Sequence, residues 1–169
     1  MSLSWSDFRR TRRRLLGSLG LLAMGTLAGC SSSSSTAEPP EETQSEALDL
    51  REANVVGVEV IESGEAYEFS VTLHHDDTGE DGYADWWQIE RPDGTRLGRR
   101  DLTHAHSQQP FTRSGIVEVP DDVGCVVVRG HDQTHGYGGQ AMVVTVESGT
   151  TRTVEQGSEP ESFEGGGCP

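Results

Sequence analysis

Six histidines lie close together in the chain, all between residues 74 and 135, and their side chains could bind a metal ion. Neutral imidazoles are common ligands of iron, copper and zinc, and a carboxylate can complete such a site. His104 and His106 are two residues apart, so their rings share one face of an extended segment. The sequence therefore predicts one transition-metal site, with ligands drawn from His75, His104, His106, His131, Asp132 and His135.

A second hypothesis stays open for the same residues. The histidines are then polar loop residues that hydrogen-bond within the chain, and the domain is a metal-free module that binds an unidentified protein or small molecule at the cell surface. The sequence contains no Gly-x-Ser-x-Gly motif, and the glycine-rich residues 136–139 open no helix, so neither a nucleophile elbow nor a phosphate loop is predicted. An enzymatic function is therefore not favoured.

The elements that must position these histidines are strands. Residues 67–74 alternate between apolar and polar side chains, which is typical of a strand with one buried face. Similar patterns, separated by turn residues, predict about seven strands at residues 56–60, 67–74, 85–90, 95–102, 115–119, 124–130 and 140–147. Short strands at this spacing favour an all-β, antiparallel β-sandwich, and we assign residues 51–156 to it.

The loops of such a sandwich would bring the histidines together. The loops at residues 75–83, 103–110 and 130–139 follow the second, fourth and sixth predicted strands, which run in the same direction. All six histidines lie in or beside these loops. The acidic residues 76–82 are interpreted as a solvated loop. Trp86 and Trp87 point to opposite faces of their strand, so we expect one in the core and the other on a surface suited to binding.

The first thirty residues predict export and attachment to a membrane. Residues 11–16, TRRRLL, fit a twin-arginine signal with Arg12 and Arg13 as the pair, and the apolar stretch that follows is shorter than the roughly 20 residues of a spanning helix. Residues 27–30, LAGC, resemble the lipobox of bacterial and archaeal lipoproteins. This resemblance implies that residues 1–29 are removed, that Cys30 carries a lipid, and that the protein lies on the extracytoplasmic face of the membrane.

Two further segments lack any apolar periodicity. Residues 30–50 are rich in serine and acidic side chains and are predicted to be a disordered tether, and residues 157–169 are predicted to be a disordered tail.

Cys125 and Cys168 could form a disulfide outside the cell. The alternative, which we favour, is that Cys125 is a small buried apolar residue and Cys168 is unpaired.

The chain is strongly acidic and contains no lysine. Its formal charge is −15, and residues 1–29 contribute five arginines and one aspartate, so the remainder carries 27 acidic and eight basic residues, or −19. This composition is typical of proteins from extreme halophiles, because molar salt screens the repulsion. The lack of a basic patch excludes nucleic acid as a partner. We expect Arg99, Arg100 and Arg113 to pair with nearby carboxylates.

Two resemblances to known families follow from longer segments. Residues 83–114 and 128–139 are similar to uncharacterised secreted proteins and lipoproteins of haloarchaea and bacteria. The order Tyr83, Trp86, residues 93–94, residues 97–99 and the Asp132-x-x-His135-Gly motif resembles superoxide reductase and desulfoferrodoxin, which implies an immunoglobulin-like sandwich. His135 matches one iron ligand of that family, whereas Asp132 occupies the position of its cysteine ligand.

Overall fold

The computed structural model describes residues 47–77 and 79–169. The predicted signal peptide at residues 1–29, with Arg12 and Arg13, lies outside the described residues. So do the predicted lipidation site Cys30 and the predicted tether up to residue 46. In the part that is described, no helix is long and apolar enough to cross a membrane.

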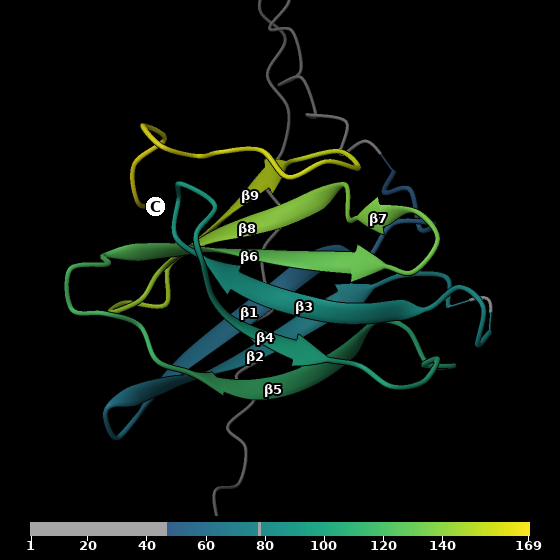
Figure 1. Ribbon diagram of the computed structural model, residues 1–169, viewed down its shortest axis with the longest axis horizontal. Coiled ribbons are helices and arrows are strands. Elements are labelled where there is room, and N and C mark those ends of the chain that lie inside the picture. Colours follow the sequence, from purple (N-terminus) through teal and green to yellow (C-terminus); the bar gives the residue numbers. More distant parts are fainter. Residues whose placement is uncertain (1–46, 78) are drawn as a thin grey trace, which may run out of the picture. The chain divides into compact units, whose positions relative to one another are not determined.

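The described residues form an all-β fold of nine strands, drawn in Figure 1. In chain order they are β1 (Asn54–Ser63), β2 (Ala66–His74), β3 (Ala84–Glu90), β4 (Arg96–Asp101), β5 (Phe111–Val117), β6 (Cys125–Asp132), β7 (Gly136–Tyr137), β8 (Gln140–Thr145) and β9 (Thr151–Glu155). The seven predicted strands correspond to β1 to β6 and β8. The two strands that the pattern did not predict are β7, which has only two residues, and β9, which is mostly polar.

The strands form two antiparallel sheets, which confirms the predicted β-sandwich. The small sheet has the order β1-β2-β5, and the large sheet has the order β4-β3-β6-β8-β9 with β7 paired to β6. Every strand pair is antiparallel. The arrowheads of β4 and β6 in Figure 1 point to the same end of the sandwich, so the loops that follow them leave from that end.

The core lies between the inner faces of the two sheets. β2 alternates as predicted, with Phe69, Val71 and Leu73 fully buried and the intervening side chains partly exposed. Trp87 of β3 is also fully buried, so it is the core member of the tryptophan pair. β6 is buried along both faces, because its other face packs in a second apolar cluster formed by Cys125, Val127, Ala141 and Val143.

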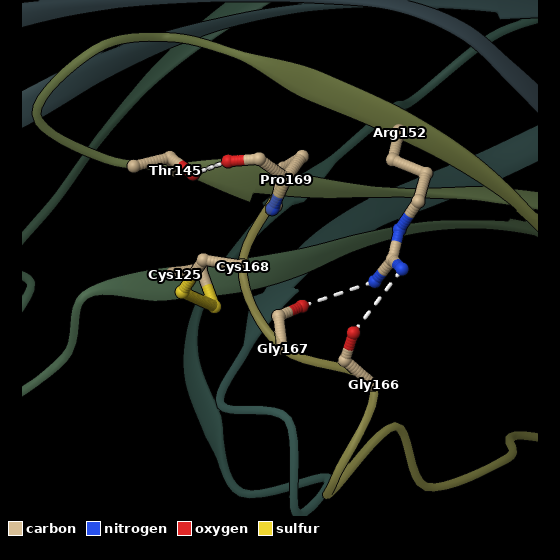
Figure 2. The surroundings of a disulfide bond; sticks show 7 residues. All are labelled: Cys125, Thr145, Arg152, Gly166, Gly167, Cys168 and Pro169. Atoms are coloured by element: carbon tan, nitrogen blue, oxygen red, sulfur yellow. Dashed lines mark hydrogen bonds between the residues drawn. A yellow bond between two sulfur atoms is a disulfide. The ribbon is translucent and has the colours of Figure 1, made fainter.

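Residues 157–169, for which a disordered tail was predicted, make several contacts with the large sheet. Cys168 forms a disulfide with Cys125 at the start of β6, so the expectation of an unpaired Cys168 is wrong. Figure 2 shows the adjacent contacts: Arg152 of β9 donates hydrogen bonds to the carbonyls of Gly166 and Gly167, at 3.1 and 3.0 Å. Phe163 packs against the second apolar cluster. We call residues 157–169 the C-terminal segment.

Candidate functional site

The three histidine-bearing loops meet at one end of the sandwich, as predicted. His75 follows β2, His106 follows β4, and Asp132 is the last residue of β6. Nε2 of His75 lies 3.2 Å from Oδ2 of Asp132. Nδ1 of His106 lies 3.5 Å from Oδ2 of Asp77 in the loop after β2. Contacts through carboxylates therefore connect all three loops.

His75 is the centre of this loop cluster. Its side chain is 1% exposed and its Nδ1 lies 2.6 Å from Oδ1 of Asp77. Its Nε2 faces the carbonyl oxygen of Arg51, at 3.1 Å, as well as the carboxylate of Asp132. Both ring nitrogens of His75 thus face oxygen atoms of the chain itself, which leaves neither available to a metal ion.

Asp77 joins the loops that follow β2 and β4. Its carboxylate is almost fully buried and accepts hydrogen bonds from the backbone N–H groups of Ala84, at 3.1 Å, and of His106. Its backbone φ is +39°, a left-handed conformation that Asp tolerates better than most residues. Residues 76–82 were interpreted as a solvated loop, and Asp76, Glu80 and Asp81 are exposed, but the carboxylate of Asp77 is buried.

Asp132 organises the turn between β6 and β7. Its Oδ1 accepts hydrogen bonds from the backbone N–H groups of Thr134 and His135, at 2.8 and 2.6 Å. The same oxygen lies 3.0 Å from Nδ1 of His135, whose side chain is half exposed. Gly136 follows with a φ of +86°, a left-handed conformation that glycine adopts without steric cost.

His104 and His106 are adjacent, with ring centroids 4.8 Å apart. The His106 ring stacks on Phe111, with centroids 3.8 Å apart, and is almost fully buried. Burial, and next the positive charge of Arg113, lower the pKa of His106 below its usual value of 6.5. The neutral imidazole is therefore the favoured form in the folded protein at neutral pH.

The structure gives the predicted metal site no support. Among residues 47–77 and 79–169, no group of three or more His, Cys, Asp or Glu side chains is arranged to hold a metal ion. His75, His106, Asp132 and His135 come together, but their contacts are with one another and with the chain. His131 lies apart from them, on the outer face of the large sheet, where its Nδ1 is 2.6 Å from Oδ1 of Asp85.

His131 belongs to an aromatic stack on that outer face. Its ring is parallel to that of Trp86, with centroids 4.2 Å apart, and Tyr137 meets Trp86 edge-on. The guanidinium of Arg99 lies 3.7 Å from the centre of the Trp86 ring. Trp86 is therefore the outward-facing tryptophan of the pair, as predicted, but its neighbours leave it only 8% exposed.

A chain of hydrogen-bonded polar side chains continues from this stack across three strands. Arg99 of β4 donates from Nε and Nη2 to Oε1 of Gln88 in β3, at 3.2 and 2.7 Å. Gln88 donates to the carboxylate of Glu90 in the same strand, and that carboxylate accepts a hydrogen bond from Arg129 of β6. Gln88, Glu90 and Arg129 are all buried, so this is an organised network beneath the surface.

This network was not predicted, although two features of the sequence indicate it. Gln88 and Glu90 alternate with the core residues Trp87 and Ile89, so they must share the outer face of β3. Arg129 interrupts a run of valines in a strand that is otherwise apolar. The expectation for Arg99 is corrected: among the described residues its hydrogen-bond partner is the amide of Gln88 rather than a carboxylate.

The C-terminal segment closes over part of the network and leaves a pocket beside it. Arg129 donates to the side-chain oxygen of Gln156 and to the carbonyl of Glu161, and its guanidinium lies 5.1 Å from the centre of the Phe163 ring. The pocket has a volume of about 470 Å³. It is lined by Gln88, Glu90, Arg96, Arg99, Arg129 and Tyr137 from the strands, by Asp93 and Gly94 from the turn between β3 and β4, and by residues 160–162 from the C-terminal segment. We call it the Arg99 pocket.

Comparison with known proteins finds one informative relative. A protein of Halomicrobium mukohataei named "Putative lipoprotein" is 67% identical to this chain over 130 residues. The aligned residues are 76% of this chain and 65% of that protein, so the chain spans about two thirds of the relative's length. This match supports the predicted resemblance to an uncharacterised lipoprotein family.

No family model and no solved structure matches the chain. The predicted resemblance to superoxide reductase and desulfoferrodoxin therefore receives no support from these comparisons.

Proposed function

We propose that the protein is a lipoprotein, anchored through Cys30 to the extracytoplasmic face of the membrane after export by the twin-arginine route. Three observations support this: the TRRRLL segment, the LAGC segment that ends at Cys30, and the name of the relative that is 67% identical. The disulfide between Cys125 and Cys168 is consistent with an oxidising compartment outside the cytoplasm.

We further propose that the protein acts there as a metal-free binding module. The observation that carries this proposal is the Arg99 pocket, a concave site lined by both cationic and anionic side chains and adjacent to the Trp86 stack. Its volume lies within the range of roughly 300–1,000 Å³ typical of small-molecule sites. The histidine loops serve the fold in this proposal, because the carboxylates of Asp77 and Asp132 connect them at one end of the sandwich.

The anchor can be tested by cell fractionation. We expect Cys30→Ala to move the protein from the membrane fraction to the soluble extracytoplasmic fraction, because the lipidated thiol is lost. Cys168→Ala is the matched control and should leave the protein in the membrane fraction. Replacing Arg12 and Arg13 together by lysine should retain the protein in the cytoplasm. A Cys30→Ala protein that stays on the membrane would contradict lipid anchoring.

The metal-free character can be tested by elemental analysis of the full-length protein, purified in molar salt without a histidine tag and reloaded with zinc, copper and iron. We expect no stoichiometric metal in the parent or in a His104→Ala, His135→Ala double variant. Near-stoichiometric metal in the parent that disappears in the double variant would instead establish the histidine loops as a metal site.

A further inference from the structure

Arg99 is held in one orientation by two neighbours. Its guanidinium stacks on Trp86 and two of its nitrogens donate to the same oxygen of Gln88. Gln88 is itself buried and fixed by its bond to Glu90. Nη1 of Arg99 makes no hydrogen bond within the described part of the chain, and the residue lines the pocket. A planar guanidinium fixed in this way is suited to a carboxylate ligand.

Arg99 forms no ion pair with a carboxylate among the described residues, although Glu90, Asp93 and Glu161 also line its pocket. Glu90, the nearest carboxylate of the network, is already paired with Arg129. Among the described residues, arginine forms ion pairs only at Arg51, Arg91 and Arg129. Arg96 is exposed and lines the same pocket. Two arginines without a carboxylate partner therefore share one pocket in a chain whose overall charge is strongly negative.

The remaining polar groups of the pocket favour a carboxylate ligand that also carries hydroxyl groups. Asp93 lines the pocket and its Oδ1 accepts a hydrogen bond from the backbone N–H of Thr95, which leaves further acceptor capacity on the carboxylate. Glu161 and Ser162 of the C-terminal segment line the same pocket, and Ser162 donates a hydrogen bond to the carbonyl of Pro92, next to Asp93. Carboxylates such as these accept hydrogen bonds from hydroxyl donors and repel a second anionic group. A ligand with one carboxylate and several hydroxyls fits both the arginines and the carboxylates of the pocket.

We infer that the Arg99 pocket binds a small polyhydroxylated carboxylic acid, that is, a sugar acid, with its carboxylate on Arg99 and its hydroxyls toward Asp93 and Glu161. The inference rests on the proposed function as a binding module and adds the chemical class of the ligand.

Calorimetric titration of the full-length protein with D-glucuronate and D-glucuronamide tests the inference. The two probes differ only in the charged carboxylate. In molar salt we expect glucuronate to bind at least about tenfold more tightly than glucuronamide, since a hydrogen bond to a charged group contributes on this scale. Arg99→Gln should abolish the difference, and Arg99→Lys, which keeps the charge but loses the planar fork, should retain only part of it.

Arg100→Gln is the matched control. Arg100 is the next residue of β4 and lies beside Gly115 of β5, so the same charge change occurs on the other side of the strand. It should leave both affinities unchanged, and thermal unfolding checks that each variant is folded. If both probes bind equally and Arg99→Gln has no effect, the sugar-acid inference fails and the binding module stands. If neither probe binds the folded protein, the sugar-acid inference also fails, whereas the binding module is contradicted only if the pocket takes no ligand of any class.

Discussion

Arg129 and Glu90 form an ion pair across β6 and β3 in which the two side chains are 0% and 3% exposed. Two of the arginine's other donors are also used, because it bonds to Gln156 and to the carbonyl of Glu161. The pair thus connects the outer face of the large sheet to the C-terminal segment. It is the most deeply buried ion pair of arginine within the part of the chain that the structure describes.

Breaking this pair should destabilise the fold strongly. Glu90→Gln keeps the shape of the side chain but leaves the charge of Arg129 uncompensated in a buried site, so we expect a loss of about 3–5 kcal/mol in the free energy of unfolding. Denaturant unfolding in molar salt measures it. The control is Asp122→Asn, because Asp122 is 70% exposed in its pair with Arg91. An exposed pair contributes at most about 1 kcal/mol, so similar losses in both variants would contradict the prediction.

Removing the disulfide should release the C-terminal segment as well as lower stability. The two cysteines are 43 residues apart, and in the chain-entropy view closing a loop of this length contributes about 2–4 kcal/mol. We therefore expect a Cys125→Ala, Cys168→Ala variant to unfold at lower denaturant. Its amide hydrogens near residues 161–168 should exchange faster, while those of β1 and β2 should not.

A thiol assay gives an independent check of the same disulfide. Alkylation of the unfolded protein, without a reductant, should leave Cys125 and Cys168 unlabelled, and labelling should follow only after reduction. Labelling of Cys168 before reduction would show that the two cysteines are not joined.

Gly130 should tolerate no side chain. A Cβ atom at this position would lie 2.1 Å from the carbonyl oxygen of Ala53, a backbone atom that can move only with its strand. We expect Gly130→Ala to cost about 1–3 kcal/mol or more, as overpacking of a core does. Gly124→Ala is the control, because the nearest atom there is Sγ of Cys168 at 3.8 Å. Equal thermal unfolding midpoints for the two variants would argue against this contact.

The buried His106 should make stability depend on pH. Its pKa is lowered below 6.5 in the folded protein, mainly by burial and next by Arg113, against the opposing charge of Asp77; His104 also lowers it. The unfolded chain therefore binds a proton at a higher pH than the folded chain does. The contribution of His106 is complete above a pH of about 6.5 and is lost as the pH falls through the folded pKa.

Denaturant midpoints at about pH 8 and about pH 5 measure this dependence. The decrease between the two pH values should be smaller in His106→Gln than in the parent, since glutamine does not titrate. His104→Gln, at the exposed neighbouring histidine, should retain the decrease of the parent. The prediction fails if His106→Gln loses as much stability on acidification as the parent does.

The strands were predictable because their signal is local. Phe69, Val71 and Leu73 alternate with polar residues, and a period of two places them on one face whatever they pack against. β7 is too short to show any period, and β9 offers only Val154 as an apolar residue, so neither could be found in this way. The convergence of the three histidine loops was also predictable, since it follows from strand direction alone.

Whether the histidines bind a metal ion or stabilise the fold was not predictable. His75 and Asp132 are far apart in the sequence. Whether they bind a metal ion or stabilise the fold depends on the burial of both side chains and on the contact of His75 with Asp77. The pattern of residues 76–82 indicated solvent, because acidic residues are usually exposed. Only the folded structure shows that the Asp77 carboxylate accepts hydrogen bonds from the backbone N–H groups of Ala84 and His106.

By itself, the sequence determined the strands and the core face of β2, because each depends on neighbours within a few residues. It also determined the end of the sandwich at which the histidine loops meet, because successive strands alternate in direction. Tertiary structure alone decided that Cys125 pairs with Cys168, that the C-terminal segment covers the outer face of the large sheet, and that Arg99 stacks on Trp86. The physical reason is that these contacts join residues from different strands, and their geometry exists only once both sheets have formed.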